Sequence, residues 1–278
     1  MNEKSPITPE DYREPRCLLN GKPSGVSPVQ PVPQQRIVEK LDEYMERRDY
    51  NGAERHLLYW LEEAVQGGDD RGRLLICNEL VGHYRKTGSR EKALARAAEA
   101  LALVDRLELG GSLSAGTTFV NAATACSAFG EDERALALFE KARKTYEARA
   151  DTGPELLGGL YNNMALALAA LGRYDEAHDL FDRAMDAMGR VPGGELEQAV
   201  TCLNRADALE AELGAAEARE RIRPLLDRAL QLLRTSAAPR DGYYAFVCEK
   251  CAPGFTHHGY PAAASELSAA AEAIYDRA

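Results

Sequence analysis

Four side chains of types that bind metal ions lie close together near the C-terminus of this chain. Cys248 and Cys251 form a Cys-x-x-Cys motif, and His257 and His258 follow it. Thiolate and imidazole are ligands of tetrahedral zinc, and paired cysteines also occur at redox centres. The alternative is structural, because both cysteines fall on an apolar helical stripe, where a free thiol packs as a small apolar side chain. Adjacent histidines point in different directions on a helix, so we favour the structural interpretation and predict no metal or other cofactor.

Motifs for other catalytic chemistry are missing from the sequence. It contains no glycine-rich phosphate loop ending in Lys-Ser or Lys-Thr, no histidine pair with metalloprotease spacing and no serine nucleophile elbow. The remaining acidic residues and histidines show no spacing that would join them in one site. We therefore predict a binding protein and not an enzyme.

The overall composition narrows the class of partner. A net charge of −10 and a pI of about 5.2 argue against nucleic acid, because phosphate binding needs a concentrated basic face. The chain has no apolar run as long as a transmembrane helix, and its first residues, MNEKSPITPEDYREPR, lack the apolar segment of a secretory signal. These features predict a cytoplasmic protein that binds neither nucleic acid nor membranes.

A fixed internal period indicates which elements position the side chains. Glycines recur every 42 residues, at Gly88, Gly130, Gly172 and Gly214. Before each glycine, apolar residues follow one another at helical spacing, and after it small and aromatic residues indicate a second helix. A repeat of this kind predicts a stack of helical hairpins without strands.

The units resemble the tetratricopeptide repeat, and the closest match is LGRYDEAHDLFDRAM, residues 171–185. The common form of that repeat has about 34 residues. The longer period here is similar to the repeats of kinesin light chains and related bacterial proteins. The resemblance implies an all-α fold, a right-handed α-solenoid of about six antiparallel helix hairpins (a TPR superhelix), that serves as a scaffold for protein–protein interaction.

Glycine and proline clusters mark the expected boundaries of the hairpins. We predict an extended, Pro- and Gly-rich tail over residues 1–33 and one solenoid domain over residues 34–278. The hairpins are expected at about 34–68, 72–107, 114–149, 155–190, 195–235 and 241–277. Because proline supplies no interior helical amide, the second helix of the fifth hairpin is expected to begin or bend at Pro224.

The resemblance also implies a binding surface, since one side of each first helix lines the concave groove of such a solenoid. Asn78, Asn162 and Asn204 share one position on that side, and their amides could pair with the backbone of an extended peptide. Thr124 is a small neighbour that lets a peptide come close. Arg85 and Lys86 add positive charge that could attract an acidic segment.

Each of these candidates has a structural alternative. The asparagines could instead bond between neighbouring first helices and fix their stacking, and Arg85 and Lys86 could simply be solvated. The tail is either passive or lies, with Cys17, Leu18 and Leu19, along the groove of its own or a neighbouring molecule.

The sequence therefore predicts a non-enzymatic scaffold that binds a protein or an extended peptide. Two alternatives stay open at this point. One is a regulatory protein that senses a signalling peptide, and the other is a metal- or thiol-active protein that uses Cys248 and Cys251.

Overall fold

The computed structural model describes residues 29–277, which form helices joined by short connections and contain no strand. The helices are α1 (Gln34–Glu46), α2 (Tyr50–Gln66), α3 (Asp70–Lys86), α4 (Arg90–Arg106), α5 (Leu113–Ala128), α6 (Asp132–Glu147), α7 (Pro154–Ala170), α8 (Tyr174–Met188), α9 (Glu195–Leu213), α10 (Ala215–Thr235), α11 (Gly242–His257) and α12 (Pro261–Tyr275). Every helix within these bounds is too short or too polar to cross a bilayer.

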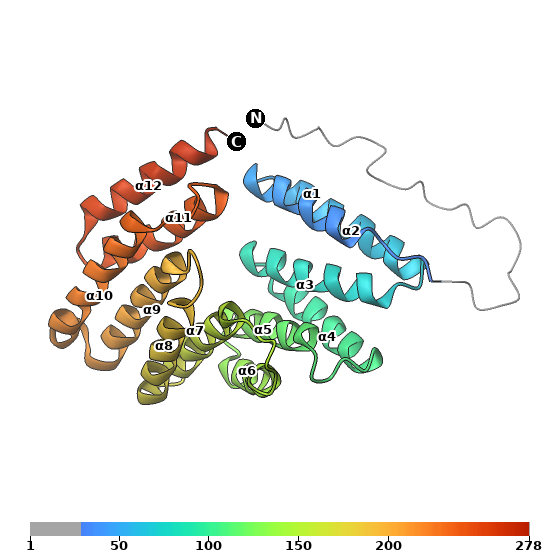
Figure 1. Ribbon diagram of the computed structural model, residues 1–278, viewed down its shortest axis with the longest axis horizontal. Coiled ribbons are helices and arrows are strands. Elements are labelled where there is room, and N and C mark those ends of the chain that lie inside the picture. Colours follow the sequence, from blue (N-terminus) through green and yellow to red (C-terminus); the bar gives the residue numbers. More distant parts are fainter. Residues whose placement is uncertain (1–28, 278) are drawn as a thin grey trace, which may run out of the picture.

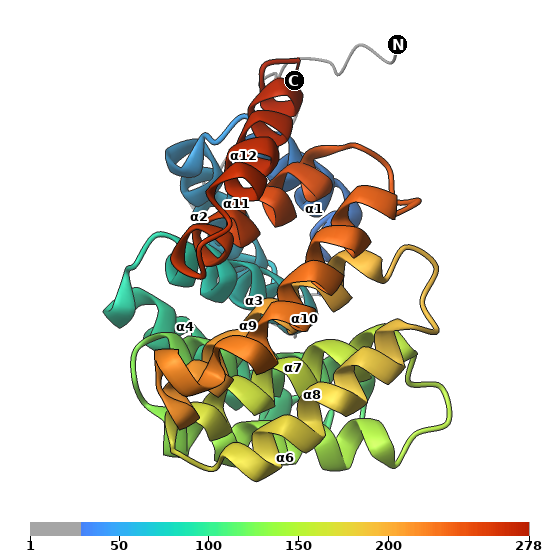
Figure 2. The ribbon, with the colours of Figure 1, turned by 90° about the vertical axis from the view of Figure 1, so that its left-hand side faces the viewer.

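Consecutive helices pair into hairpins, from α1 with α2 to α11 with α12 (Figure 1). The hairpins stack so that α3, α5, α7, α9 and α11 contact one another in turn along an inner layer, and the even-numbered helices lie outside it. Figure 2 shows the same stack from the side, with successive hairpins rotated about its axis. The chain is thus an all-α repeat superhelix, as the sequence predicted.

The periodic glycines end the first helix of a hairpin. Gly88, Gly130 and Gly172 have φ angles of 69°, 76° and 72°, a left-handed conformation that glycine adopts without the steric cost of a Cβ. In the first of these turns the Ser89 amide donates to the Tyr84 carbonyl at 2.8 Å, which caps the last turn of α3. Arg48 takes the same left-handed conformation, with φ 56°, where the first hairpin lacks the glycine.

Small residues in the second helices let the hairpins close. Ala93, Ala135 and Ala177 are completely buried, and so are Phe139 and Phe181 one turn further along their helices. Alanine permits close approach of the two helices, and the aromatic rings fill the remaining volume. The apolar core forms two contiguous clusters that meet near the junction of α8 and α9.

The structure rules out one of the two alternatives expected at Pro224, namely that the second helix of the fifth hairpin begins there. The helix α10 begins at Ala215 and continues through Pro224, so it does not start there. The buried residues Ala218, Ile222 and Leu226 recur every fourth position on both sides of the proline and hold the helix against α9. Because Pro224 is exposed, water can satisfy the carbonyl that loses its helical partner.

The described part of the predicted tail lies against the connection between α2 and α3. The Gln30 amide donates to the Gly67 carbonyl at 2.9 Å, and the Val32 amide donates to the Asp69 carboxylate at 2.9 Å. The Asp69 side chain also caps α3 by accepting from the Gly72 amide at 2.9 Å. These bonds fix the entry to α1, whereas the predictions for Cys17, Leu18 and Leu19 lie outside the described residues.

The two ends of the superhelix meet, which the sequence did not indicate. The Arg48 guanidinium lies over the Tyr275 ring at 4.0 Å, and the Lys86 ammonium lies 5.0 Å from the centre of the Phe246 ring. Figure 1 shows the first hairpin beside α11 and α12. The inner layer therefore curves round until the first two hairpins touch the last one.

Candidate functional site

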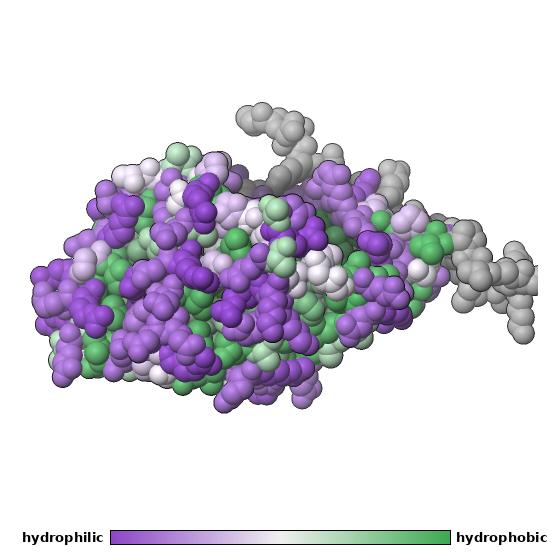
Figure 3. All heavy atoms as spheres, turned by 60° about the horizontal axis from the view of Figure 1, so that its bottom comes forward, coloured by the Kyte–Doolittle hydropathy of each residue, from purple (hydrophilic) through white to green (hydrophobic). Residues whose placement is uncertain are grey.

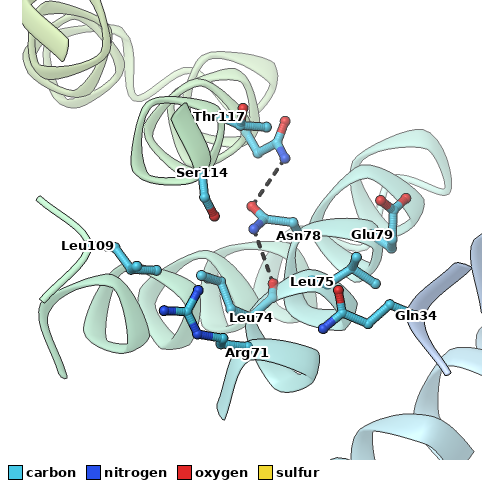
Figure 4. A pocket seen from close by; sticks show the side chains of 10 residues that line it. Gln34, Arg71, Leu74, Leu75, Asn78, Glu79, Leu109, Ser114 and Thr117 are labelled. Atoms are coloured by element: carbon cyan, nitrogen blue, oxygen red, sulfur yellow. Dashed lines mark hydrogen bonds between the residues drawn. The ribbon is translucent and has the colours of Figure 1, made fainter. Parts of the chain in front are cut away.

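A pocket of about 350 Å³ opens on the concave face between α1, α3 and α5. Its walls carry apolar, polar and charged side chains, namely Gln34, Arg71, Leu74, Leu75, Asn78, Glu79, Leu109, Ser114, Thr117 and Asn121 (Figure 4). The three leucines give the pocket an apolar part, and the polar groups stand around it. A mixed lining of this kind suits a peptide side chain together with its backbone.

Asn78 uses its amide to bond the helices around it. Its Nδ2 donates to the Leu74 carbonyl at 3.1 Å and to the Thr118 hydroxyl at 3.0 Å, and its Oδ1 accepts from Asn121 Nδ2 at 3.1 Å. Both of its amide hydrogens are therefore used within the protein. At this position the stacking interpretation holds, because the bonds join α3 to α5.

Asn162 and Asn204 form a second amide pair, between α7 and α9. Asn204 Nδ2 donates to Asn162 Oδ1 at 2.9 Å. Within residues 29–277, the Nδ2 of Asn162 and the Oδ1 of Asn204 have no hydrogen-bond partner, and neither does the Oδ1 of Asn121. Each pair thus joins two inner helices and keeps some hydrogen-bonding capacity for a ligand.

The other predicted groove residues differ in how free their polar groups are to contact a ligand. The Thr124 hydroxyl donates to the Asn121 carbonyl of its own helix at 2.9 Å. Lys86 lies between two aromatic rings, at 5.3 Å from Tyr50 and 5.0 Å from Phe246, and so contributes to the contact between the ends. The Arg85 side chain is exposed and forms no ion pair within the described part of the chain, and partial desolvation by the surrounding protein lowers its pKa.

Two carboxylates of the inner helices, Glu79 of α3 and Glu197 of α9, were not singled out from the sequence. Burial raises the pKa of Glu79, and the nearby Asp42 charge adds to the shift. Burial also raises the pKa of Glu197, which the Lys250 charge partly offsets, and Glu197 accepts a hydrogen bond from the Tyr243 hydroxyl. Glu79 directly follows Asn78 in the sequence. Its position next to a predicted groove residue could have marked it as a candidate.

The structure does not support the candidate metal or thiol site formed by Cys248, Cys251, His257 and His258. Cys248 and Cys251 are buried in the core of the last hairpins, and burial raises the pKa of both thiols, that of Cys251 to about 12. A thiol that stays protonated at neutral pH is neither a good nucleophile nor a ready metal ligand. At the C-terminal end of α11, His257 and His258 instead contact Glu210 and Asp207, so the structure does not bring the four predicted ligands together.

Figure 3 presents the face of the molecule that lies at the bottom of Figure 1. Hydrophilic side chains cover most of this face, with smaller apolar areas between them. Dispersed apolar residues are ordinary on a protein surface. The pocket between α1, α3 and α5 is the candidate site, because it combines leucines with polar side chains on the inner helices.

Comparison with known families and structures supports the repeat assignment. The family model described as tetratricopeptide repeat matches residues 72–148, which cover nearly all of α3 to α6. Among solved structures, BtubC (BKLC) from P. vanneervenii is 20% identical over 71% of this chain and 78% of its own, with a TM-score of 0.59. The comparison with curated proteins gives no match.

Two further structures share the fold. A Rap protein complexed with competence and sporulation factor is 16% identical over 88% of this chain and 64% of its own, with a TM-score of 0.56. A point variant of the TPR-like repeats of a putative kinesin light chain from Podosopora anserina is 19% identical over 74% of this chain and 95% of its own, with a TM-score of 0.50. The resemblance found in the sequence is confirmed, and these structural likenesses establish the fold.

Proposed function

Since residues 72–148 are tetratricopeptide repeats within an all-α repeat superhelix, we propose that this protein is a non-enzymatic scaffold whose concave groove binds an extended peptide segment of a partner protein. The observation that carries the proposal is the pocket between α1, α3 and α5, which combines an apolar part with polar groups that are not fully used. Its volume of about 350 Å³ suits one or two side chains of a peptide.

Two arginines of α3 favour a segment that contains acidic residues, and they are opposed by the Glu79 carboxylate of the pocket, whose pKa burial raises. Arg85 carries a positive charge with no carboxylate partner in residues 29–277, and the protein around it reduces its solvation. Arg71 adds a second exposed guanidinium on the same helix, at the rim of the pocket. Guanidinium groups pair with carboxylates through directional, charge-assisted hydrogen bonds.

The spacing of these two arginines sets the length of the segment. Arg71 and Arg85 lie about 21 Å apart along α3 at 1.5 Å per helical residue. An extended peptide covers about 3.3 Å per residue, so six or seven residues connect the two charges. Between them the peptide backbone passes Asn121, whose Oδ1 can accept a backbone amide.

Selection from a random heptapeptide display library, followed by fluorescence polarisation of the selected peptides, tests this function. We expect acidic residues on either side of an apolar residue, and Arg85→Ala to weaken binding about tenfold, the scale of one charge-assisted hydrogen bond of ~1.5 kcal/mol. Arg221, an exposed arginine of the outer helix α10, supplies the matched control Arg221→Ala, which should bind as the wild type does. Equal binding by the Arg71→Ala, Arg85→Ala double variant would contradict the proposal.

A second candidate is a regulatory protein that senses a signalling peptide. The likeness to the Rap protein complex supports it, since that fold covers 88% of this chain. This chain matches 64% of that structure, so any effector function is a further proposal. A sensor would change the distance between its two ends when a selected peptide binds, whereas a passive scaffold would keep it.

The cellular location stays a proposal. We place the scaffold in the cytoplasm, and the five cysteines of the described residues, all free thiols, are compatible with a reducing compartment.

A further inference from the structure

Two histidines and two carboxylates converge where α9 and α11 end, outside the concave site. His257 Nε2 lies 2.7 Å from Glu210 Oε2, and His258 Nδ1 lies 3.6 Å from the same oxygen. One ligand atom from each of these three residues lies within 4.8 Å of the others. Imidazole nitrogen and carboxylate oxygen are the donor types of His- and Glu-containing zinc sites.

Asp207 fixes the orientation and tautomer of His258. Its Oδ1 lies 2.8 Å from His258 Nε2, and because a carboxylate only accepts, Nε2 carries the hydrogen. The lone pair of the neutral ring is then on Nδ1, the atom that faces Glu210. A carboxylate that orients a histidine through its second nitrogen is a common feature of protein metal sites. The His258 side chain is only 6% exposed, so this orientation is held by its surroundings.

We propose that His257, His258 and Glu210 bind a divalent transition-metal ion of the zinc class, with Asp207 as the residue that orients His258. In a tetrahedral site with bonds of 2.0 to 2.1 Å, ligand atoms lie about 3.4 Å apart. The two separations from Glu210 Oε2 lie on either side of that value, so small movements of the exposed His257 side chain would complete the arrangement. The metal replaces the hydrogen that His257 and Glu210 share, and water from the adjoining cavity of about 450 Å³ supplies the fourth ligand.

The electrostatic surroundings favour a cation. Glu210 lies in the last turn of α9, and His257 is the last residue of α11, so two helix C-termini direct their partial negative charge at the site. Asp207 and Glu210 add formal negative charge. Arg219 and Arg223 line the cavity from α10 and oppose a cation, but Arg223 is paired with Glu220 at 3.2 Å.

A metal ion at this site would link the last hairpin, through α11, to α9 of the preceding hairpin. At the other junctions the second helix of one hairpin packs on the first helix of the next, whereas α11 packs mainly on α9 and only slightly on α10. The proposed ligands link the ends of α9 and α11 that lie farthest from the connection at residues 236–241. The site therefore adds a link at a junction where α10 and α11 pack little against each other.

The test is a Zn²⁺ titration of the full chain, free of any affinity tag, in competition with a chromophoric chelator. We expect one Zn²⁺ per chain, weakened on the order of 100-fold by His257→Ala and about 10-fold by Asp207→Asn, with the stoichiometry retained in the second variant. Co²⁺ should give the visible absorption of a four-coordinate ion in the wild type and lose it in His257→Ala. Because His257 is 61% exposed, its replacement leaves the fold intact, which circular dichroism verifies.

Two variants serve as controls. His178 pairs with Glu212 at 3.0 Å, a single histidine–carboxylate pair between α8 and α9, so His178→Ala should bind Zn²⁺ as the wild type does. Cys251→Ala should also leave the affinity unchanged, because its thiol is buried away from the cluster. The proposal is overturned if the wild type binds no Zn²⁺, if His257→Ala binds it equally well, or if either control loses it.

Discussion

Arg48 and Glu249, which are 201 positions apart in the sequence, form an ion pair that closes the superhelix on itself. Arg48 Nη2 lies 3.0 Å from Glu249 Oε1, and Tyr275 flanks the guanidinium. Both side chains are about half exposed, at 47% and 52%. Solvent-exposed pairs typically contribute about 0.2 to 1 kcal/mol, so this contact biases the distance between the ends without locking it.

Removal of this pair should open the ring with little loss of stability. Glu249→Gln keeps the size of the side chain and removes its charge, and it avoids the special backbone conformation of Arg48. We expect the distance distribution between spin labels on the first and last hairpins to broaden and lengthen, while the free energy of unfolding falls by less than about 1 kcal/mol. High salt should broaden the wild-type distribution in the same direction. An unchanged distribution in the variant would show that packing alone sets the curvature.

The turns of the fold were predictable because each depends on a local requirement. Gly88, Gly130 and Gly172 occupy left-handed conformations at the end of a helix, and the same need produces the same residue every 42 positions. The alanines of the second helices follow equally from local packing. The contact of Arg48 with Glu249 depends instead on rotation accumulated over the whole stack, which no single unit encodes.

The candidate site was predictable only in part for a related reason. The repeat register placed Asn78, Asn162 and Asn204 on one side of the inner helices. Whether an amide faces a ligand or a neighbouring helix depends on the offset between two helices, and this offset pairs Asn78 with Asn121. Pro224 shows the same limit, because buried residues on both sides hold its helix together despite the missing amide.

The conformational role of the periodic glycine can be tested against a glycine inside a helix. A Cβ added at Gly88 or at Gly82 meets nothing within 4 Å, so neither substitution causes a clash. Gly88→Ala forces a left-handed alanine and should cost about 1 to 2 kcal/mol, whereas Gly82→Ala in α3 should gain about 0.5 to 1 kcal/mol. Chemical denaturation measures both. Equal effects of the two substitutions would contradict the assigned role of the turn.

Gly116 should be intolerant for a different reason, its close approach to an aromatic ring. An added Cβ would lie 2.2 Å from Tyr146 Cε1, and Tyr146 is held by a hydrogen bond of 2.9 Å between its hydroxyl and Thr117. We expect Gly116→Ala to destabilise the protein by about 1 to 3 kcal/mol through overpacking between α5 and α6. Gly159→Ala is the control, because its added Cβ meets nothing within 4 Å and should stabilise α7. A Gly116→Ala variant with the unfolding free energy of the wild type would contradict this prediction. It would mean that α5 and α6 can move apart without loss of stability.

The amide of Asn78 should contribute to stability and not only to binding. Asn78→Ala removes the bonds to Thr118 and Asn121 that join α3 to α5. It leaves the Nδ2 of the half-buried Asn121 without a partner, whereas the Thr118 hydroxyl keeps its bond to the Ser114 carbonyl. The expected cost is about 1 to 3 kcal/mol. Asn163 is a half-buried asparagine without a hydrogen bond inside the described chain, so Asn163→Ala should change the free energy of unfolding by less than about 0.5 kcal/mol. Similar losses of unfolding free energy in the two variants would contradict the stabilising role assigned to the pair of Asn78 and Asn121.

Stability should fall in mild acid because of buried histidines in the first two hairpins. Burial lowers the pKa of His56 below its usual 6.5, Lys40 adds to the shift, and the bond between His56 Nε2 and the Ile37 carbonyl at 3.0 Å opposes it. Above pH 6.5 both the folded and unfolded states hold a neutral ring. As the pH drops below 6.5 the unfolded chain takes up the proton first, so the free energy of unfolding decreases until the folded pKa is passed.

Glutamine at position 56 can still donate to the carbonyl but does not titrate, so His56→Gln should lose less stability than the wild type between pH 7.5 and 5.5. Burial also lowers the pKa of His83, so part of the acid sensitivity should remain in the variant. Denaturant midpoints at the two pH values measure the difference, and an identical drop in both proteins would assign the acid sensitivity to other groups.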